Sequence, residues 1–226
     1  MYRPEPYQEN SPDTLRTLMR RWPFAALVTF GASGMTATHL PFLIDVDAQG
    51  DTLLTTHLSR RNAQYDDLRQ GCPAMVIFQG PSAYISPSWY DEKRTFPTWN
   101  YAAIHAYGDI EVIDDADGIK HILDRVVDTF DGPVAGEWTF AGIPAEMTAL
   151  RLPKIAGVVM KVTRLDGALK LNQDHSDADK HGVIAALESR ADAGGREIAA
   201  LMRETMNATA REISRTDDSQ RKPPRK

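Results

Sequence analysis

Hydrophobic and polar positions alternate along the first part of the chain in short runs that turn-forming residues separate. Three such runs cover 24–30, 35–46 and 52–57, with the sequences GASG and DAQGD between them. Apolar residues bounded by glycine-containing turns at this spacing are typical of antiparallel hairpins. Further strand patterns follow at 74–78, 83–86, 101–113 and 155–165.

Other segments follow the helical period of 3.6 residues. Residues 11–23 begin with a serine that can cap a helix and a proline suited to its first turn, and Leu15, Leu18 and Met19 share one face. The clearest helix is 114–130, where apolar residues recur at three- and four-residue spacing. Further helical patterns cover 60–70, 143–150, 177–189 and 196–212. About six strands with inserted and appended helices predict an α+β protein built on a small β-barrel.

Composition places the chain among ordinary globular proteins. It has 226 residues, of which 42% are hydrophobic and 25% are charged. It has no run of eighteen apolar residues and no basic-then-apolar order at its start, so we expect neither a membrane span nor a secretory signal. Cys72 is the only cysteine, which excludes an intrachain disulfide. These features predict a cytoplasmic protein.

Charge is spread unevenly along the chain. The net charge is −5, and the segment 215–226 carries five basic and two acidic residues, which leaves −8 for the rest. An acidic body is a poor basis for nucleic-acid binding, because that affinity comes mainly from neutralising phosphates. The polar, proline-ended segment 215–226 is predicted to be a disordered basic tail, which either touches nucleic acid or is only a solvated end.

The stretch THLSRRNAQ, residues 56–64, has the clearest chemistry. It joins the end of a predicted strand to the start of a predicted helix, where backbone N–H groups are free. Ser59 is a natural helix cap, and Arg60 and Arg61 add fixed positive charge. This combination suits an anion, most simply a phosphate. A capped surface helix with two solvated arginines is the alternative.

Two further stretches offer polar groups for a ligand. Thr36 and Thr38 lie on a predicted strand and can hydrogen-bond a planar heterocycle. KLNQ, residues 170–173, follows a strand and a predicted turn at Gly167, and offers a cation and amides. An ordinary surface turn is the alternative for KLNQ.

The histidines show no metal-binding spacing. His39, His57 and His105 stand alone in the sequence, and no pattern such as HExxH is present, so we expect no metal site. Each of the three is either a structural histidine or a ligand of a bound group. Dinucleotide and P-loop glycine motifs are also missing.

The stretch SPSWYDEKRTFPTWNY, residues 86–101, concentrates five aromatic residues on what is predicted to be a loop. Such rings either shield a planar ligand or plug the contact between two subunits, and a ring pair contributes about 0.5–1.5 kcal/mol beyond its buried area. Both roles stay open for Trp89, Tyr90, Phe96, Trp99 and Tyr101.

Taken in order, these motifs resemble one family. MYRPEPY, PFAALVT, ATHLPFLID, HLSRRNAQ, VIFQGPSAYISPSWY, PTWNYAAIHAYG and KLNQD are similar to the PaiB-like proteins, described as FMN-binding negative transcriptional regulators. The resemblance covers roughly residues 1–190 and implies an FMN-binding split β-barrel domain over that range. It leaves a C-terminal helix at 191–214 and the tail at 215–226.

The resemblance also implies a homodimer, with flavin at the subunit interface. The related pyridoxamine-phosphate oxidases hold the FMN phosphate with a strand-end threonine followed by Ser-Arg-Lys. In TTHLSRRNA the matching positions are Thr55, Ser59, Arg60 and Arg61, and Arg61 keeps the charge of the lysine. KLNQD has Asn172 where the oxidases have a histidine, which argues against pyridoxamine phosphate as a substrate.

The predicted function is that of an FMN-binding, PaiB-like negative regulator. A flavin-dependent oxidoreductase is the main alternative, and a haem-handling split barrel that uses one of the three histidines is another. DNA is a possible partner through Arg203, Arg211, Arg215 and the tail, although no helix-turn-helix is evident. The expected cofactor contacts are Thr36, Thr38, His39, Thr55, Ser59, Arg60, Arg61, Trp99, Asn100, Lys170 and Gln173.

Overall fold

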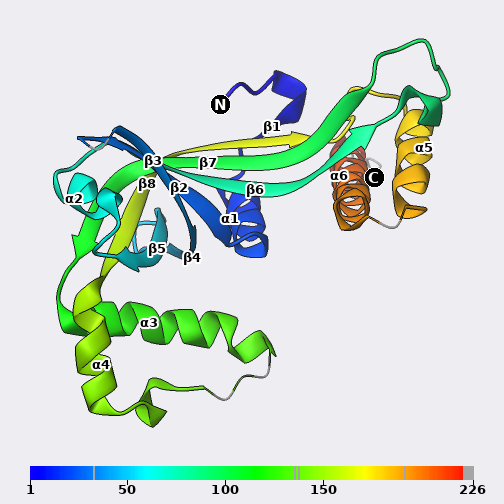
Figure 1. Cartoon of the computed structure of the whole chain (residues 1–226). Coiled ribbons are helices and arrows are strands. Elements are labelled where there is room, and N and C mark those ends of the chain that lie inside the picture. The colour runs from blue at the N-terminus through cyan, green and yellow to red at the C-terminus, as the bar shows by residue number, and fades with distance from the viewer. Residues whose placement is uncertain (33, 135, 137, 191, 221–226) are drawn as a thin grey trace, which may run out of the picture. The chain divides into compact units, whose positions relative to one another are not determined.

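The computed structural model (Figure 1) contains an antiparallel sheet of eight strands. It describes residues 1–32, 34–134, 136, 138–190 and 192–220, with side chains up to residue 208. The strand order is β3-β2-β6-β7-β8-β5-β4, and β1 also pairs with β8. The strands are β1 (Gln8–Glu9), β2 (Phe24–Gly31), β3 (Gly34–Pro41), β4 (Leu43–Val46), β5 (Thr52–Ser59), β6 (Ala74–Ile85), β7 (Thr98–Ile113) and β8 (Ile155–Lys170).

Six α-helices accompany the sheet in the described part of the chain. They are α1 (Pro12–Arg21), α2 (Ala63–Arg69), α3 (Ala116–Phe130), α4 (Ala145–Arg151), α5 (Asp177–Glu188) and α6 (Ala193–Gln220). Short 3-10 helices cover Glu5–Tyr7, Pro87–Trp89, Gly132–Val134, Phe140–Gly142 and Leu152–Lys154. The strand path ends at β3 and β4, and the sheet is not closed. The eight-stranded sheet with its helices confirms the predicted α+β class.

The first helix forms as its sequence pattern indicates. The Ser11 hydroxyl accepts a hydrogen bond from the backbone N–H of Thr14, which caps the helix start. Leu15, Leu18 and Met19 are buried on its inner face. Amphipathic spacing and a local cap agree here, so the prediction from sequence is confirmed.

Two predicted strand boundaries are wrong. The run 35–46 is not one strand, because it breaks at Phe42, whose ring is 1% exposed and whose N–H donates to the Pro23 carbonyl. No turn occurs at Gly167, since β8 runs through it to Lys170. A Cβ at this glycine would lie 2.3 Å from a Leu15 methyl group and 2.8 Å from a backbone oxygen of β1. The glycine therefore allows close packing within the strand and does not reverse the chain.

The middle strands are longer than their patterns indicate. The predicted strands at 74–78 and 83–86 form the single strand β6, which continues through the sequence GPS. Strand β7 begins at Thr98, inside the aromatic stretch that was predicted to be a loop. Hydrogen bonds to neighbouring strands extend β6 and β7 beyond the lengths that local propensity predicts.

The chain forms two compact units built from separate segments. Unit 1 contains Met1, 9–79 and 103–167, and unit 2 contains 2–8, 80–102 and 168–226. In unit 1, Leu27, Phe78 and Met160 are completely buried, and α3 contributes Ile119 and Ile122. The larger apolar residues on the rest of α3, which are Leu123, Val126, Val127 and Phe130, are only half-buried.

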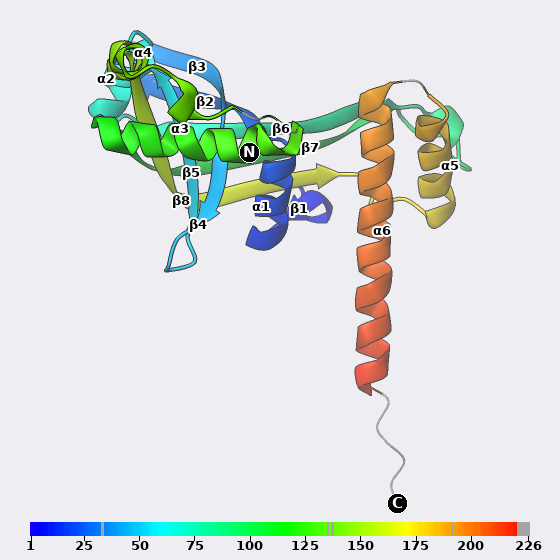
Figure 2. The ribbon, with the colours of Figure 1, turned by 90° about the horizontal axis from the view of Figure 1, so that it is seen from below.

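Unit 2 has a core of its own. Helices α5 and α6 lie side by side (Figure 2), with Val183, Ile184 and Leu187 of α5 buried together with Ile198 and Met202 of α6. Helix α6 extends to Gln220, beyond the expected helix end at 214, and residues 221–226 of the predicted tail lie outside the described residues. No described helix is long and apolar enough to cross a membrane.

Candidate functional site

The turn between β5 and α2 carries the residues predicted to hold a phosphate. Helix α2 begins at Ala63, and its cap is Asn62, whose side-chain oxygen accepts from the N–H of Gln64 at 3.0 Å. The predicted cap, Ser59, is instead the last residue of β5, and its hydroxyl accepts from the N–H of Arg61 at 3.2 Å. The cap prediction was wrong because Ser59 still pairs with Ile155 in the sheet.

Arg60 is held by the protein itself. Its guanidinium donates to the carbonyl oxygens of Ile155 and Asp114 and to the Tyr65 hydroxyl, each within 2.9 Å. It also lies 2.8 Å from the Asp114 carboxylate and 5.2 Å from the centre of the Tyr65 ring. These contacts join the β5–α2 turn to α2, to β8 and to the residue that follows β7 around one half-buried cation, so Arg60 has a structural role.

Arg61 differs from Arg60 in its exposure and in the contacts of its guanidinium. Its residue is exposed, and within the described residues its guanidinium has no hydrogen bond or ion pair. The Ser59 hydroxyl beside it accepts a backbone N–H and keeps its own proton for donation. Arg61 and Ser59 together therefore present N–H and O–H donors to a ligand.

Two residues that the sequence analysis did not single out tie this turn to β3. The Asn62 side chain donates to the Thr38 hydroxyl at 2.8 Å. The Gln64 amide donates to the carbonyl oxygens of Leu27 and Thr36 and to the Thr29 hydroxyl, at 3.0, 3.3 and 3.0 Å. The Gln64 side-chain oxygen is buried and has no hydrogen-bond partner in the described chain, an arrangement that an ordered water, an ion or a ligand would explain. The polar pattern NAQ after the arginines was the available signal.

The predicted contacts on β3 divide between two faces. Burial alternates along the strand, with Thr36 and Thr38 half-buried and Met35 and His39 exposed. The threonines face α2, whereas His39 stacks against Phe24 at 6.1 Å between ring centres. Thr36 and Thr38 therefore cannot contact a ligand on the same face as His39.

Thr55 and the remaining candidate histidines have different surroundings. Thr55 is 5% exposed and pairs with Leu43 and Val159 within the sheet. Burial lowers the pKa of His57, whose Nδ1 has no partner in the part of the chain that the structure describes. Burial also lowers the pKa of His105, as does the positive chain terminus to a lesser degree. Both rings favour the neutral form.

The predicted contacts in unit 2 have separate surroundings of their own. Asn100 and Lys170 line a polar cavity of about 170 Å³. Gln173 is occupied by its own turn, because its amide donates to the Leu169 carbonyl and accepts from the Leu171 N–H. Trp99 is 56% exposed and packs edge-on against Tyr84.

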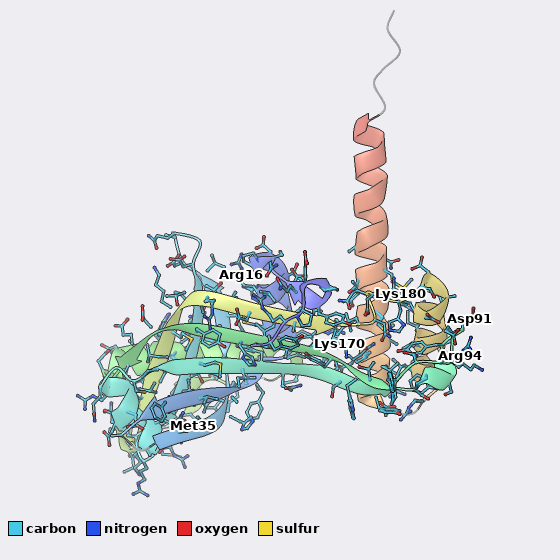
Figure 3. The ribbon with its side chains drawn as sticks, turned by 90° about the horizontal axis from the view of Figure 1, so that it is seen from above. Arg16, Met35, Asp91, Arg94, Lys170 and Lys180 are labelled. Carbon is cyan, nitrogen blue, oxygen red and sulfur yellow. The ribbon has the colours of Figure 1, made fainter. Side chains whose placement is uncertain are left out.

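The aromatic stretch 86–101 is divided between burial and exposure. Tyr90 is 3% exposed and stacks on His175 at 4.7 Å between ring centres, while Trp89 lies under Arg190. The loop contacts α5, since the N–H of Asp91 donates to Asp179; Asp91 and Arg94 are labelled in Figure 3. Phe96 is 87% exposed. Some rings therefore build unit 2, and others are available for a ligand or a second subunit.

No described group of three or more His, Cys, Asp or Glu side chains is arranged to hold a metal ion. The donors of the β5–α2 turn suit an anion instead. The sequence model of the family described as "Putative FMN-binding domain" matches residues 1–164. The chain belongs to this family. FMN is the cofactor that this membership supports.

Relatives of known sequence extend the match over most of the chain. It is 28% identical over 210 residues to the Bacillus subtilis protein named "Protease synthase and sporulation protein PAI 2", which covers 91% of this chain and 98% of that protein. It is 26% identical over 247 residues to an uncharacterized protein of Emericella nidulans, covering 90% and 97% of the two chains. The PaiB-like resemblance is thus confirmed.

Solved structures show the same fold. An FAD and haem binding protein of Mycobacterium smegmatis aligns with a TM-score of 0.57 and 21% identity, over 80% of both chains. A flavocytochrome of Azotobacter vinelandii aligns with a TM-score of 0.54 and 13% identity, over 77% of this chain and 74% of that one. These structural alignments establish the shared split-barrel fold, and because the sequence identities are low they establish nothing further.

Proposed function

We propose that the chain holds FMN by its phosphate at the β5–α2 turn. The observation that carries this proposal is the contrast between Arg60, whose guanidinium is fully engaged, and Arg61, which is exposed with no partner in the described structure. A phosphate of about −1.5 to −2 charge matches the Arg61 guanidinium and the Ser59 hydroxyl. The donor set therefore fits the phosphate end of FMN.

Contacts with the flavin ring are a separate part of the proposal. Thr36 and Thr38 lie next to the turn through Asn62 and Gln64, which supports them as neighbours of the cofactor. Trp99, Asn100, Lys170 and Gln173 belong to unit 2, and their contact with FMN stays a prediction. FMN, when bound, supplies redox chemistry, and the protein orients it and controls access of water.

The test is a fluorescence titration of the purified protein with FMN and with riboflavin, which lacks the phosphate. We expect FMN to bind at least about tenfold more tightly, because a charge-assisted hydrogen bond contributes about 1.5–3 kcal/mol. Equal affinities for the two flavins would contradict a phosphate-directed site. Reduction of the bound flavin by NADH or NADPH in the same sample would favour the oxidoreductase alternative over a regulator.

We also propose a homodimer that covers the outer face of β2 and β3. Phe30 and Met35 are paired across these strands, and Phe24 and His39 lie on the same face; Figure 3 labels Met35. Phe24, Phe30 and Met35 are 63%, 63% and 78% exposed on the edge hairpin of the sheet. Exposed apolar residues at a sheet edge favour association. Light scattering should give about twice the 25.1 kDa mass, and Met35→Glu should shift it toward one copy.

A role as a negative regulator is the finer proposal, and α6 with the tail is its DNA element. Arg203, one of the three arginines expected there, donates from Nε and Nη2 to the two carboxylate oxygens of Glu188, which lowers the pKa of that carboxyl. The proposed contact with DNA therefore rests more on residues 215–226 than on Arg203. Binding to DNA should weaken steeply with salt and weaken again when 215–226 are deleted. Unchanged binding after the deletion would exclude the tail, and no sequence-selective binding at physiological salt would point to an indirect effect.

A further inference from the structure

The polar cavity in unit 2 has features that its packing does not explain. It is formed by β7, the end of β8 with the turn after it, the aromatic stretch and the segment before β1. Asn100 and Asn172 are 0% and 2% exposed, and the side-chain oxygen of each is buried without a hydrogen-bond partner in the described residues. A buried acceptor without a partner destabilises the folded state unless a bound group satisfies it.

The orientation of Asn100 follows from its other contact. Its side-chain nitrogen lies 3.6 Å from the sulfur of Met202, and a thioether can only accept a hydrogen bond. The nitrogen therefore faces the sulfur, and the oxygen is left as an acceptor. The Asn172 nitrogen donates to the Tyr90 hydroxyl at 2.7 Å, which leaves a second acceptor.

The backbone at Asn172 adds to the cost of this arrangement. Its φ is +60°, the only positive φ among the described residues other than glycine. Glycine would adopt this conformation with less strain, yet an amide side chain stands here and its oxygen is unsatisfied. A non-glycine residue in this conformation and a buried acceptor without a partner occur here at one position, and together they motivate a ligand hypothesis.

Opposite charges line the same cavity without meeting. Lys170, labelled in Figure 3, donates to the Thr98 hydroxyl and lies 5.8 Å from the centre of the Tyr7 ring. Asp174 accepts from the Tyr7 hydroxyl at 3.0 Å, and burial and this carboxylate raise the pKa of Tyr7 to about 12, so it remains a donor. Within the described chain, neither Lys170 nor Asp174 has an ion-pair partner.

We propose that this cavity binds a small zwitterion with an ammonium and a carboxylate group, such as a small α-amino acid. The ammonium has three N–H donors, and three residues that line the cavity, Asn100, Asn172 and Asp174, carry side-chain acceptors. Lys170 meets the carboxylate. A volume of about 170 Å³ is below the range of roughly 300–1,000 Å³ that holds drug-sized ligands, so the ligand is small.

The test is calorimetric titration of the full chain with L-alanine, and with ethylammonium and propionate as its two separate halves. We expect saturable binding of L-alanine and at least about tenfold weaker binding of each half, since each loses one charge-assisted contact worth about 1.5–3 kcal/mol. Asn172→Gly is compatible with the positive φ and removes one acceptor together with the hydrogen bond to Tyr90, so it should weaken L-alanine at least about tenfold and also lower the melting temperature, with circular dichroism to verify folding. Lys170→Met should weaken it similarly, while Lys93→Met, at an exposed position outside the cavity, should not.

Three results would overturn the inference. One is a dissociation constant for L-alanine weaker than about 10 mM, which would leave ordered water as the occupant. Another is equal affinity in the Asn172→Gly variant. The third is loss of L-alanine binding when FMN is added, because Asn100 and Lys170 would then serve as the flavin contacts that the sequence predicts and not as contacts of a second ligand. The inference does not rest on the proposed phosphate site, so a failed FMN titration and a failed L-alanine titration are separate results.

Discussion

Replacing Arg61 by alanine is expected to weaken FMN binding roughly tenfold to a hundredfold, because it removes a charge-assisted contact worth about 1.5–3 kcal/mol. The exposed guanidinium of Arg61 has no partner in the described structure, so the melting temperature of the variant should be unchanged. Riboflavin affinity should also be nearly unchanged. The measurement is the fluorescence titration with both flavins, with circular dichroism to verify folding.

Two further variants sharpen this experiment. Arg61→Lys keeps the charge and loses the bidentate donor geometry, so its FMN affinity should fall between those of wild type and alanine. Arg94→Ala removes another exposed arginine, in unit 2, and controls for the change in net charge. A folded Arg61→Ala protein that binds FMN as tightly as wild type would leave this turn as an ordinary surface feature.

Replacing Arg60 by alanine is expected to act on stability first. The change removes hydrogen bonds to two backbone carbonyls and to the Tyr65 hydroxyl, together with the ion pair to Asp114. The arginine and aspartate side chains are 27% and 36% exposed, so solvent screens the pair and we expect a loss of only about 1–3 kcal/mol. Melting should then fall by about 2–4 °C for each kcal/mol lost.

Comparison with Arg61 makes this prediction specific. Thermal unfolding of Arg60→Ala and Arg61→Ala, measured side by side without flavin, should show a lower melting temperature for Arg60→Ala alone. Arg60→Lys should recover only part of the loss, because an ammonium cannot satisfy all of these fixed acceptors at once. Equal melting temperatures for Arg60→Ala, Arg60→Lys and Arg61→Ala would show that the contacts of Arg60 contribute little.

The comparison of adjacent arginines shows where sequence reasoning ends. Sequence alone predicted a basic turn after a strand, because residue type and order carry that information. It could not tell which arginine is free, since the acceptors of Arg60 come from residues 114 and 155, far away in the chain. In the same way, a serine followed by two arginines resembles a helix start, but sheet pairing with Ile155 keeps Ser59 in β5 and moves the cap to Asn62.

The sequence by itself determined the first helix and the hairpins, because periodicity, caps and turn residues depend only on neighbouring positions. Its motifs also determined the family and the class of cofactor. Only the tertiary structure decided the lengths of β6 and β8, the faces of β3 and the composition of the unit 2 cavity. Tyr7, Asn100 and Asn172 meet there through strand pairing and helix packing. Such contacts depend on the path of the whole chain, and no local pattern around any one of these residues encodes them.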